Sequence, residues 1–248
     1  NIPFIIYENN LLLGKSNRYL IRLASKVFLA YEDAEGIDLR FKSKVVTTGN
    51  IVREETLNFN NEKKYLEGEL NILILGGSQA AQSFGEFLPG IFKQCVSEKI
   101  KIKIIQQCAE SQNNKLNKYY KNLKINYELF NFTDNILKYF SKTELVITRS
   151  GSSVTGELIN CKLPFISIPY PYSADSHQDK NAVYFEKKGY SFLIKENEVS
   201  EKLFPLIKLI YSDKEILNKL IEKQKKHSDT SVFFKINKEI KNLINEPN

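Results

Sequence analysis

The sequence predicts an α/β protein whose strands run parallel. Short apolar runs recur along the chain, and helix-compatible segments separate most of them, an alternation typical of a parallel sheet. Two of the runs also lead into turns rich in glycine and serine and then into a helical pattern, at residues 72–79 and 145–157. Because helices cover both faces of such a sheet, we expect helix–sheet–helix layers.

The first part of the chain contains too few elements for a complete layered domain. We predict strands at residues 3–7, 26–30 and 44–47 and a helix at roughly 16–23. One helix cannot cover both faces of a parallel sheet, so roughly two or three βα units are expected upstream. The chain also begins at Asn1 and contains no methionine, which favours a fragment of a longer protein.

The second part of the chain has the more regular alternation. A polar stretch at residues 54–69 is interpreted as a linker, and Pro89 is expected to kink the first long helix or to start a second one. Apolar stripes at helical spacing continue to the end, and we expect the last helix to cross back onto the first domain. The predicted domains are therefore 1–53 with 232–248, and 54–231. The predicted strands lie at residues 72–75, 102–105, 125–129, 145–148, 165–168 and 191–194.

Composition limits the class of protein. The net charge of +7 fits an anionic ligand or an anionic membrane surface, although most lysines are interpreted as solvating surface helices. No zinc spacing, recognition-helix pattern or aromatic–basic strand motif indicates nucleic acid. Cys95, Cys108 and Cys161 share no metal or redox spacing and are expected to be buried thiols in the cytoplasm. No run approaches the ~18 apolar residues of a membrane span, so membrane contact is expected to be peripheral.

The two Gly/Ser junctions favour a phosphate-bearing ligand. Glycine lets the backbone approach a ligand closely, and the start of a helix presents unpaired N–H groups to an anion. Glu157 follows Gly151 on the second predicted helix, near this phosphate site. Its carboxylate could accept hydrogen bonds from both hydroxyls of a ribose. An ordinary solvent-facing glutamate is the alternative.

Gln178 and Asn181 are spaced to share one face of a helix. Their uncharged amides suit the hydroxyls of a sugar. The alternative is an ordinary helix start capped by Asp175 or Ser176. His177 has no catalytic partner in view and is interpreted as structural or ligand-lining.

Three further positions are interpreted from their place in the chain. Arg53 falls at the predicted linker, where it could pair with a phosphate or form a surface salt bridge. Residues 7–10 follow the carboxyl end of a predicted strand, the edge at which open α/β sheets bind ligands. His227 lies in a lysine-rich helix end and is expected to be solvated.

Together these segments resemble the MurG family, the UDP-N-acetylglucosamine–N-acetylmuramyl-(pentapeptide) pyrophosphoryl-undecaprenol N-acetylglucosamine transferases of peptidoglycan synthesis. The similarity covers nearly the whole chain, and the ordered set is more specific than any one motif. It runs in order through Ile2-Pro3, Glu8-Asn9-Asn10, Gly14, Asn17, Thr48-Gly49-Asn50-Ile51-Val52-Arg53, Gly76-Gly77-Ser78-Gln79, Arg149-Ser150-Gly151, Glu157, Pro169-Tyr170-Pro171, Asp175 to Gln178, Asn181 and Ala182.

The resemblance implies a glycosyltransferase-B architecture with two Rossmann-like domains, of which the first is incomplete here. It implies inverting transfer of GlcNAc from UDP-GlcNAc to the muramyl 4-hydroxyl of lipid I, which forms lipid II. This reaction would take place at the cytoplasmic face of the bacterial inner membrane. No cofactor and no essential metal are implied.

The resemblance also implies roles for residues of the second domain. Ser78 and its loop would contact the diphosphate, Glu157 would bind the ribose, and the main chain around Thr133 would line the uracil site. Gln178 and Asn181 would bind the hydroxyls of GlcNAc.

From the first domain and the linker, Asn10 and Arg53 would reach the donor. The sequence departs from the family at Ile51, usually proline, and at Ala80, usually glycine, and these two residues are expected to shift the linker and the phosphate loop slightly. The histidine proposed as general base in the family has no counterpart here. We therefore expect this chain to bind UDP-GlcNAc without turnover, and the catalytic residue stays unassigned.

Alternatives of other classes stay open. A UDP-GlcNAc 2-epimerase or a lipid glycosyltransferase that uses diacylglycerol would share the fold, although residues 8–10 and 76–79 favour the peptidoglycan enzyme. A non-catalytic UDP-sugar-binding module is the second alternative. A nicotinamide dehydrogenase is disfavoured because no G-x-G-x-x-G follows a predicted strand.

Overall fold

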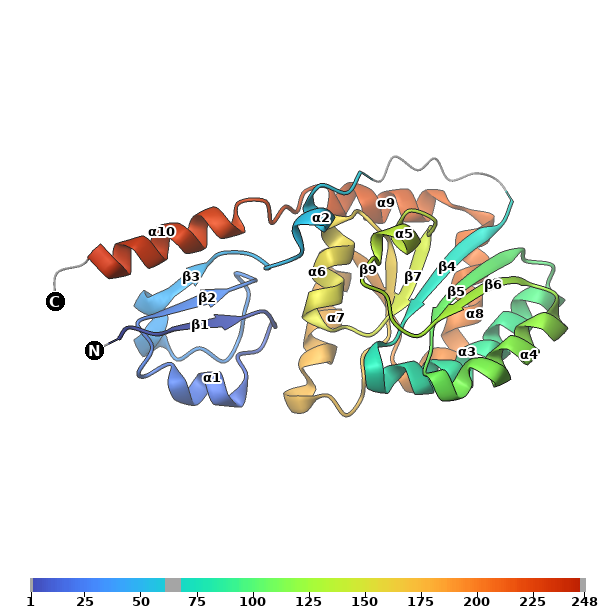
Figure 1. The fold of residues 1–248 in the computed structure, drawn as a ribbon, viewed down its shortest axis with the longest axis horizontal. Helices are drawn as coiled ribbons and strands as arrows, with labels where there is room; N and C mark the ends of the chain where they lie inside the picture. Colours follow the sequence, from blue (N-terminus) through green and yellow to red (C-terminus); the bar gives the residue numbers. More distant parts are fainter. Residues whose placement is uncertain (1, 61–67, 246–248) are drawn as a thin grey trace.

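The protein's structure, a computed structural model, describes residues 2–60 and 68–245, apart from the side chains of residues 77–81. Its strands form two parallel sheets, one of three strands in the order β1-β2-β3 and one of six in the order β6-β5-β4-β7-β8-β9. Figure 1 shows the smaller sheet beside the larger one, joined by two chain crossings. The predicted α/β class with parallel strands is confirmed.

All the predicted strands form, and their ends lie within two residues of the predicted ends. The prediction succeeded because strands buried on both faces are continuous apolar runs, which stand out from the polar segments around them. The strands are β1 (Ile5–Glu8), β2 (Lys26–Leu29), β3 (Val45–Thr47), β4 (Leu70–Leu75), β5 (Ile102–Gln107), β6 (Asn126–Phe130), β7 (Leu145–Thr148), β8 (Phe165–Ser167) and β9 (Ser191–Leu193).

Helices cover both faces of the larger sheet and follow most of its strands (Figure 1). The helices are α1 (Lys15–Leu20), α2 (Glu54–Leu57), α3 (Gly77–Ser97), α4 (Asn113–Leu123), α5 (Leu137–Phe140), α6 (Ser152–Asn160), α7 (His177–Lys187), α8 (Val199–Ser212), α9 (Glu215–Gln224) and α10 (Val232–Asn245), with the short 3₁₀ turns η1 (Leu39–Lys44) and η3 (Ala174–Ser176).

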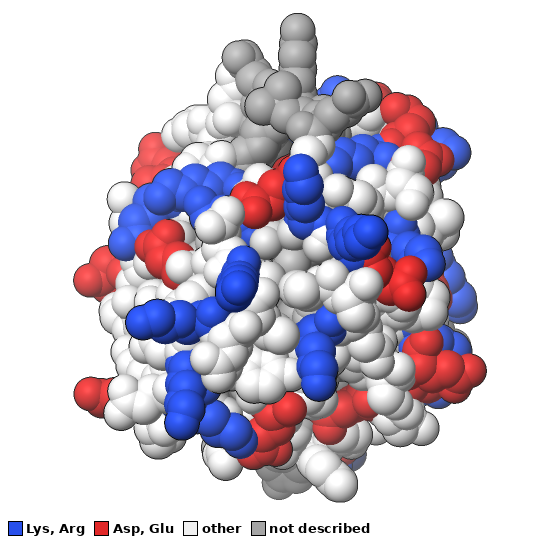
Figure 2. Space-filling model, turned by 90° about the vertical axis from the view of Figure 1, so that its right-hand side faces the viewer, with Lys and Arg blue, Asp and Glu red and all other residues white. Residues whose placement is uncertain are grey.

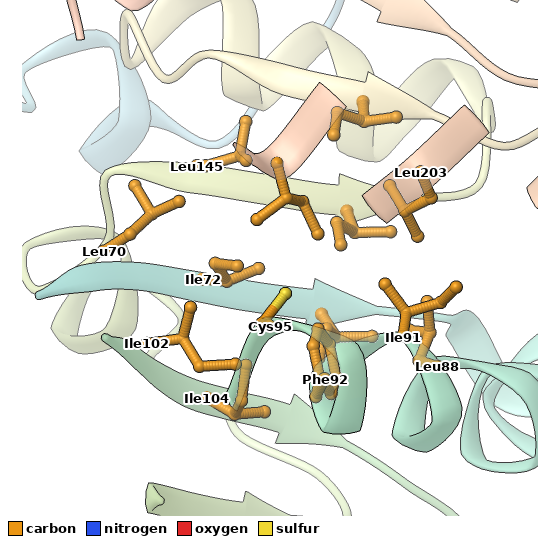
Figure 3. Close-up of a cluster of buried hydrophobic side chains, with 14 of the residues drawn as sticks. Leu70, Ile72, Leu88, Ile91, Phe92, Cys95, Ile102, Ile104, Leu145 and Leu203 are labelled. Carbon is orange, nitrogen blue, oxygen red and sulfur yellow. The ribbon is translucent and has the colours of Figure 1, made fainter. Parts of the chain in front are cut away.

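The core of the larger unit alternates along its central strand. Ile72 and Ile74 of β4 belong to a cluster that includes Phe92 of α3 and Leu203 of α8 (Figure 3). Leu73 belongs to the cluster on the opposite face, which α5, α6 and α7 close. All five side chains are completely buried. Complete burial contributes roughly 1.5–3 kcal/mol to the stability of the fold for each side chain. The close packing holds the sheet rigidly, so the positions of the residues at its carboxyl edge are well defined.

Pro89 lies inside a single helix. α3 continues through this residue, so the predicted alternative of a second helix starting there is not formed. Proline removes one N–H from the helical ladder. Leu88 and Phe92, on either side of it, are completely buried against the sheet, and their packing offsets that cost.

The last helix lies along the smaller sheet rather than the larger one (Figure 1). Val232 at its start is buried, and further along Glu239 pairs with Lys26 of β2 at 3.4 Å. The second chain crossing therefore runs from α9, in the larger unit, to α10, beside the smaller sheet. Part of the predicted linker, residues 61–67, lies outside the described residues.

Candidate functional site

A cavity of about 450 Å³ opens at the carboxyl edge of the larger sheet. β4 and β7 are neighbours there, but β5 and β8, which follow them in the chain, lie on opposite sides. Such a switch point leaves a crevice between strand ends, where open α/β sheets bind ligands. The lining includes Gly76 after β4, Gln107 at the end of β5, Thr133 after β6, Gly151 after β7 and Tyr170 after β8, with Arg53 from the linker.

Two helices begin at this cavity. α3 starts directly after Gly76 and α6 directly after Gly151, and neither start has a side-chain cap among the described residues. The first N–H groups of a helix have no partner within it, and the helix dipole adds partial positive charge. Both starts can therefore receive an anion. Ser78 lies in the first turn of α3, but its side chain lies outside the described residues.

Arg53 and Glu157 form a bidentate ion pair beside the cavity. Arg53 Nε and Nη2 donate to the two oxygens of Glu157, each at 2.7 Å. The hydrogen bonds to Glu157 raise the pKa of Arg53. Glu157 is not the solvent-facing residue of the alternative interpretation, because its side chain is only 15% exposed. The pair joins the linker to α6, and its arginine lines the cavity.

Arg149 is a buried cation in the cavity lining for which the sequence analysis proposed no role. Burial lowers its pKa, and the hydrogen bond to Glu196 acts in the opposite direction. By tying the loop after β7 to α3 and to the end of β8, it fixes the relative position of the two helix starts. The only signal in the sequence was an arginine directly after a buried strand. Its guanidinium donates to Ser83 Oγ at 2.6 Å, to the carbonyls of Ile168 and Pro169 at 3.2 Å each and to Glu196, and it packs over the ring of Phe84.

Gln178 of α7 lines the cavity with an oriented amide. Its Oε1 accepts a hydrogen bond from the backbone N–H of Tyr170 at 3.0 Å. This bond identifies Oε1 as the acceptor, so the other end of the amide is the NH₂ donor. Within the described ranges, this NH₂ group has no hydrogen-bond partner. Gln178 can therefore donate to an oxygen of a ligand.

Asn181, predicted to share this role, is completely buried and does not line the cavity. Its Oδ1 accepts from Leu11 N at 3.0 Å, and its Nδ2 donates to Asn10 Oδ1 at 3.1 Å and to the Ser150 carbonyl at 3.0 Å. In this structure Asn181 connects the loop after β1 to the loop after β7. Its direct contact with a sugar stays a prediction, and so does that of Asn10.

Glu8 organises the loop that carries Asn10, a role the sequence analysis missed. Its buried carboxylate accepts from Asn10 N at 3.1 Å and Asn10 Nδ2 at 3.0 Å, and from Gly14 N and Asn17 Nδ2 at 2.9 Å each. A carboxylate directly after the predicted strand, followed by several short polar residues and a glycine, was the signal in the sequence that could have revealed this turn.

The loop after β6 forms an apolar wall of the cavity. Phe132, Thr133 and Ile136 line it, and Phe132 is 77% exposed. Beneath them, the rings of Phe130 and Tyr139 stack with centroids 4.3 Å apart. Thr133 Oγ1 accepts from Asn135 N at 3.1 Å, so the side chain fixes its own loop and the wall can receive a flat apolar group.

At two helix ends the structure differs from the sequence analysis. The alternative of a capped start of α7 is not formed: Ser176 occupies the N-cap position, but its side chain makes no cap hydrogen bond, and both Asp175 and Ser176 adopt left-handed backbone angles. Asp175 instead pairs with Lys15 and Arg18 of α1, at 3.0 and 3.1 Å. His227 is not solvated: its side chain is 19% exposed, and its Nε2 lies 2.8 Å from a carboxylate oxygen of Asp229. His177 is half-buried and lies outside the cavity lining, with Nδ1 2.7 Å from the Ala174 carbonyl.

Comparison with known proteins agrees with this geometry. The sequence profile of the glycosyltransferase family 28 C-terminal domain matches residues 71–238. The UDP-N-acetylglucosamine–N-acetylmuramyl-(pentapeptide) pyrophosphoryl-undecaprenol N-acetylglucosamine transferase of Pelagibacter ubique is 32% identical over 99% of this chain. The enzyme of the same name from Rickettsia bellii is 36% identical over 83% of the chain. The crystal structure of Acinetobacter baumannii MurG superimposes on 96% of the chain, with a TM-score of 0.77 and 22% identity.

The chain spans 69% of the Pelagibacter relative, 61% of the Rickettsia relative and 67% of the Acinetobacter chain. The structural match establishes the glycosyltransferase-B fold, and the sequence matches establish the family. This chain therefore belongs to glycosyltransferase family 28, within the hexosyltransferases named UDP-N-acetylglucosamine–N-acetylmuramyl-(pentapeptide) pyrophosphoryl-undecaprenol N-acetylglucosamine transferases.

Proposed function

We propose that this chain supplies the UDP-GlcNAc site of an enzyme that transfers GlcNAc to lipid I with inversion and so forms lipid II. One observation carries the proposal: a cavity at the switch point of the larger sheet, with two helix starts and the Arg53–Glu157 pair beside it. Residues 54–231 would form the donor domain. Residues 1–53 with 232–248 would belong to the acceptor and membrane domain.

The cavity offers a complementary place for each part of the donor. The diphosphate would lie at the starts of α3 and α6, where N–H groups and dipoles meet its charge. The uracil would lie against the wall around Thr133, and Gln178 would donate to a hydroxyl of GlcNAc. Glu157 would accept from the ribose hydroxyls.

Arg53 links binding to the departure of UDP. In this structure both oxygens of Glu157 accept hydrogen bonds from Arg53, so a ribose has to compete with that pair. We expect Arg53 to turn toward the diphosphate when the donor binds. There its fixed charge, together with the two helix starts, would stabilise the negative charge that develops on UDP as the glycosidic bond breaks.

Among the described residues, the lining of the cavity offers no general base, because it contains no histidine and no carboxylate. Activation of the acceptor hydroxyl would need such a group within hydrogen-bond reach. The 248-residue chain is therefore expected to bind the donor and not to transfer its sugar, so lipid II formation by this chain alone would contradict the proposal.

An exposed surface of the smaller unit is proposed to meet the anionic membrane surface. Tyr19, Leu23 and Leu39 are 71–81% exposed, and Arg22 and Lys42 lie exposed near them in the sequence. Apolar side chains with lysine and arginine suit an anionic bilayer surface. By contrast, Figure 2 views the other end of the molecule, the far side of the larger unit, where positive and negative side chains are interspersed. No helix of the described ranges is long and apolar enough to cross a membrane.

Liposome flotation tests this surface. Binding should increase with the anionic lipid fraction and fall in the variant Leu23→Ser/Arg22→Gln. The matched variant Lys118→Gln, on exposed α4, should bind as the unchanged chain does. If liposome binding changed neither with the anionic lipid fraction nor in the Leu23→Ser/Arg22→Gln variant, this part of the proposal would be refuted.

Calorimetric titration of UDP-GlcNAc tests the donor site, with UDP-glucose and ADP-glucose as controls. The variant Glu157→Ala should weaken UDP-GlcNAc binding by about tenfold or more, because it removes a charged acceptor of two hydrogen bonds. Glu222→Ala, an exposed glutamate on α9, should bind normally. Absence of binding by the unchanged chain would contradict the donor site, whereas equal binding by Glu157→Ala would contradict only the ribose contact.

A further inference from the structure

Both chain crossings between the two units meet at one buried carboxylate. The linker that follows β3 passes Asn50 and reaches Arg53, and the segment after α9 passes Asp229 on its way to α10 (Figure 1). Asp229 lies between these segments and α6 and is only 2% exposed.

Asp229 binds all three segments. Its Oδ1 accepts from the backbone N–H of Asn50 at 2.9 Å, and its Oδ2 accepts from Asn160 Nδ2 of α6 at 2.6 Å. His227 Nε2 lies 2.8 Å from the same Oδ2. The Asp229 N–H donates back to Asn160 Oδ1 at 3.2 Å. We call these four residues, Asp229, Asn50, Asn160 and His227, the Asp229 junction.

Two glycines show how closely the linker fits here. Gly49 has a φ of +105°, and a Cβ on it would lie 2.6 Å from Asp229 Oδ1 and 2.6 Å from Val232 Cγ2. A Cβ on Gly156 of α6 would lie 2.7 Å from Asn50 Nδ2. The linker therefore has little room to shift while the junction is intact.

The smaller unit holds the same stretch from the other side. Asn50 Nδ2 donates to the Tyr31 hydroxyl at 2.5 Å, and the Tyr7 hydroxyl accepts from Ile51 N at 2.8 Å. On the other side of the ion pair, the buried Thr56 donates its hydroxyl to the Arg53 carbonyl at 2.6 Å. The backbone of Arg53 is thus fixed both before and after the residue.

The junction reaches both partners of the ion pair at the cavity. Arg53 lies three residues after Asn50, and Glu157 lies three residues before Asn160, one turn along α6. A single carboxylate binds Asn50 and Asn160 together, so it sets the separation of the linker and α6 at the point where Arg53 meets Glu157.

We propose that Asp229 is a positioning residue for the donor site: it holds the linker against α6 so that Arg53 stands at the diphosphate position. The inference rests on the proposed function, because it assigns Arg53 to the donor. Asp229 itself lies outside the cavity lining. It acts through Arg53 alone, and this distinguishes it from a residue that merely stabilises the fold.

A double-mutant cycle on UDP-GlcNAc binding tests the proposal. Asp229→Asn keeps the shape of the side chain but replaces one acceptor oxygen by a donor, which faces the N–H groups of its partners. Asp229→Asn and Arg53→Gln are each expected to weaken binding about tenfold. If Asp229 acts through Arg53, the double variant should bind about as weakly as either single one. Tenfold losses that multiply in the double variant, or unchanged affinity in Asp229→Asn, would overturn the proposal.

Two further variants separate positioning from general stability. Glu144→Gln removes another buried carboxylate, which accepts from Asn71 N at 2.9 Å and pairs with Lys214 at 2.6 Å, at the start of β7 and away from the cavity. It should lower stability and leave affinity unchanged. Gly156→Ala keeps Asp229 but pushes on Asn50, and it should reproduce the loss of affinity and its dependence on Arg53. It serves as the test if Asp229→Asn does not fold.

Hydrogen exchange distinguishes failure of this inference from failure of the donor site. In Asp229→Asn, the amides of residues 50–53 should lose protection, while Glu144→Gln should leave them protected. If the unchanged chain does not bind UDP-GlcNAc, the proposed function fails, and the exchange result alone decides whether Asp229 holds the linker. Unchanged protection at residues 50–53 would overturn that role.

Discussion

Among the contacts between the two units of the molecule, which include the buried hydrogen bonds of Asn181, two regions are held by different physical means. The Asp229 junction is buried, and hydrogen bonds of fixed direction join its members. The second region, which we call the α7 seam, joins the smaller unit to η3 and α7 through exposed ion pairs. Its pairs are Lys180–Glu35, Lys188–Asp33 at 3.1 Å, Lys15–Asp175 at 3.0 Å and Arg18–Asp175 at 3.1 Å.

The difference indicates which region sets the geometry of the candidate site. A buried hydrogen bond is strong and directional, and a displaced partner leaves a desolvated group unpaired. An exposed ion pair between long side chains can re-form in many arrangements and is screened by salt. We infer that the junction fixes the position of Arg53, and that the ion pairs of the seam, which border a cleft of about 510 Å³ beside α7, do not set it.

The largest expected effect comes from filling the space at the junction. Gly49→Ala should lower the free energy of unfolding by about 2–4 kcal/mol, because it combines a strained positive φ with a Cβ contact of 2.6 Å. Urea unfolding measures the loss.

Gly90→Ala on α3 is the matched control, since a Cβ there meets nothing within 4 Å. It should raise stability by up to about 1 kcal/mol, because alanine favours the helix. Equal stability of Gly49→Ala and the unchanged chain would show that the junction is not closely packed.

The next largest effect is the pH dependence of Asp229→Asn. Burial tends to raise the pKa of Asp229, but the hydrogen bonds from His227 and Asn160 outweigh it and hold the pKa below its usual range. A lowered folded-state pKa contributes stability that is present above the unfolded value of about 3.9 and is lost as the pH falls toward the folded value. Near neutral pH, the free energy of unfolding of Asp229→Asn should therefore be roughly 1–3 kcal/mol lower than that of the unchanged chain. This difference should become smaller below about pH 4.

Asp175→Asn in the seam provides the comparison. Hydrogen bonding to Lys15 lowers the pKa of Asp175 as well, but its side chain is 21% exposed, against 2% for Asp229. Asp175→Asn should lose much less unfolding free energy than Asp229→Asn at every pH. If the loss in Asp229→Asn stayed constant into the acid range, the charge of Asp229 would contribute nothing to stability.

The positions of the strands could be predicted from the sequence. Which polar residues are buried and which line the cavity could not be predicted. Apolar runs such as that of β7 are determined by local burial on both faces, which a single sequence displays directly. The spacing of Gln178 and Asn181 correctly predicted that they lie on one helix. Spacing does not show which of them faces the cavity, because that depends on the loops of β1 and β7 that close over Asn181.

Charged residues were misjudged where their partners are distant in the chain. The lysines around His227 suggested a solvated helix end, but the buried Asp229 turns the histidine inward. Arg149 looked like one more residue of a motif, although its partners come from α3, the end of β8 and the 3₁₀ turn at Glu196. Such contacts exist only after the sheet has assembled, so no local pattern reveals them.

The smallest expected effect is in the seam, and it sharpens the comparison most. The double variant Lys180→Gln/Lys188→Gln should lower stability by less than about 1 kcal/mol at low salt, since both pairs are exposed. The loss should disappear in about 1 M NaCl, where charges are screened beyond roughly 3 Å. Urea midpoints at both salt concentrations measure it, with Lys225→Gln, an exposed lysine of a pair outside the seam, as control. The loss in Asp229→Asn should persist in high salt, because the Asp229 side chain is only 2% exposed and salt screens a buried group little. If the seam variant kept its loss in salt while the junction variant did not, the assignment of the two regions would have to be reversed, and Arg53 would be positioned by the approach of α7 rather than by Asp229.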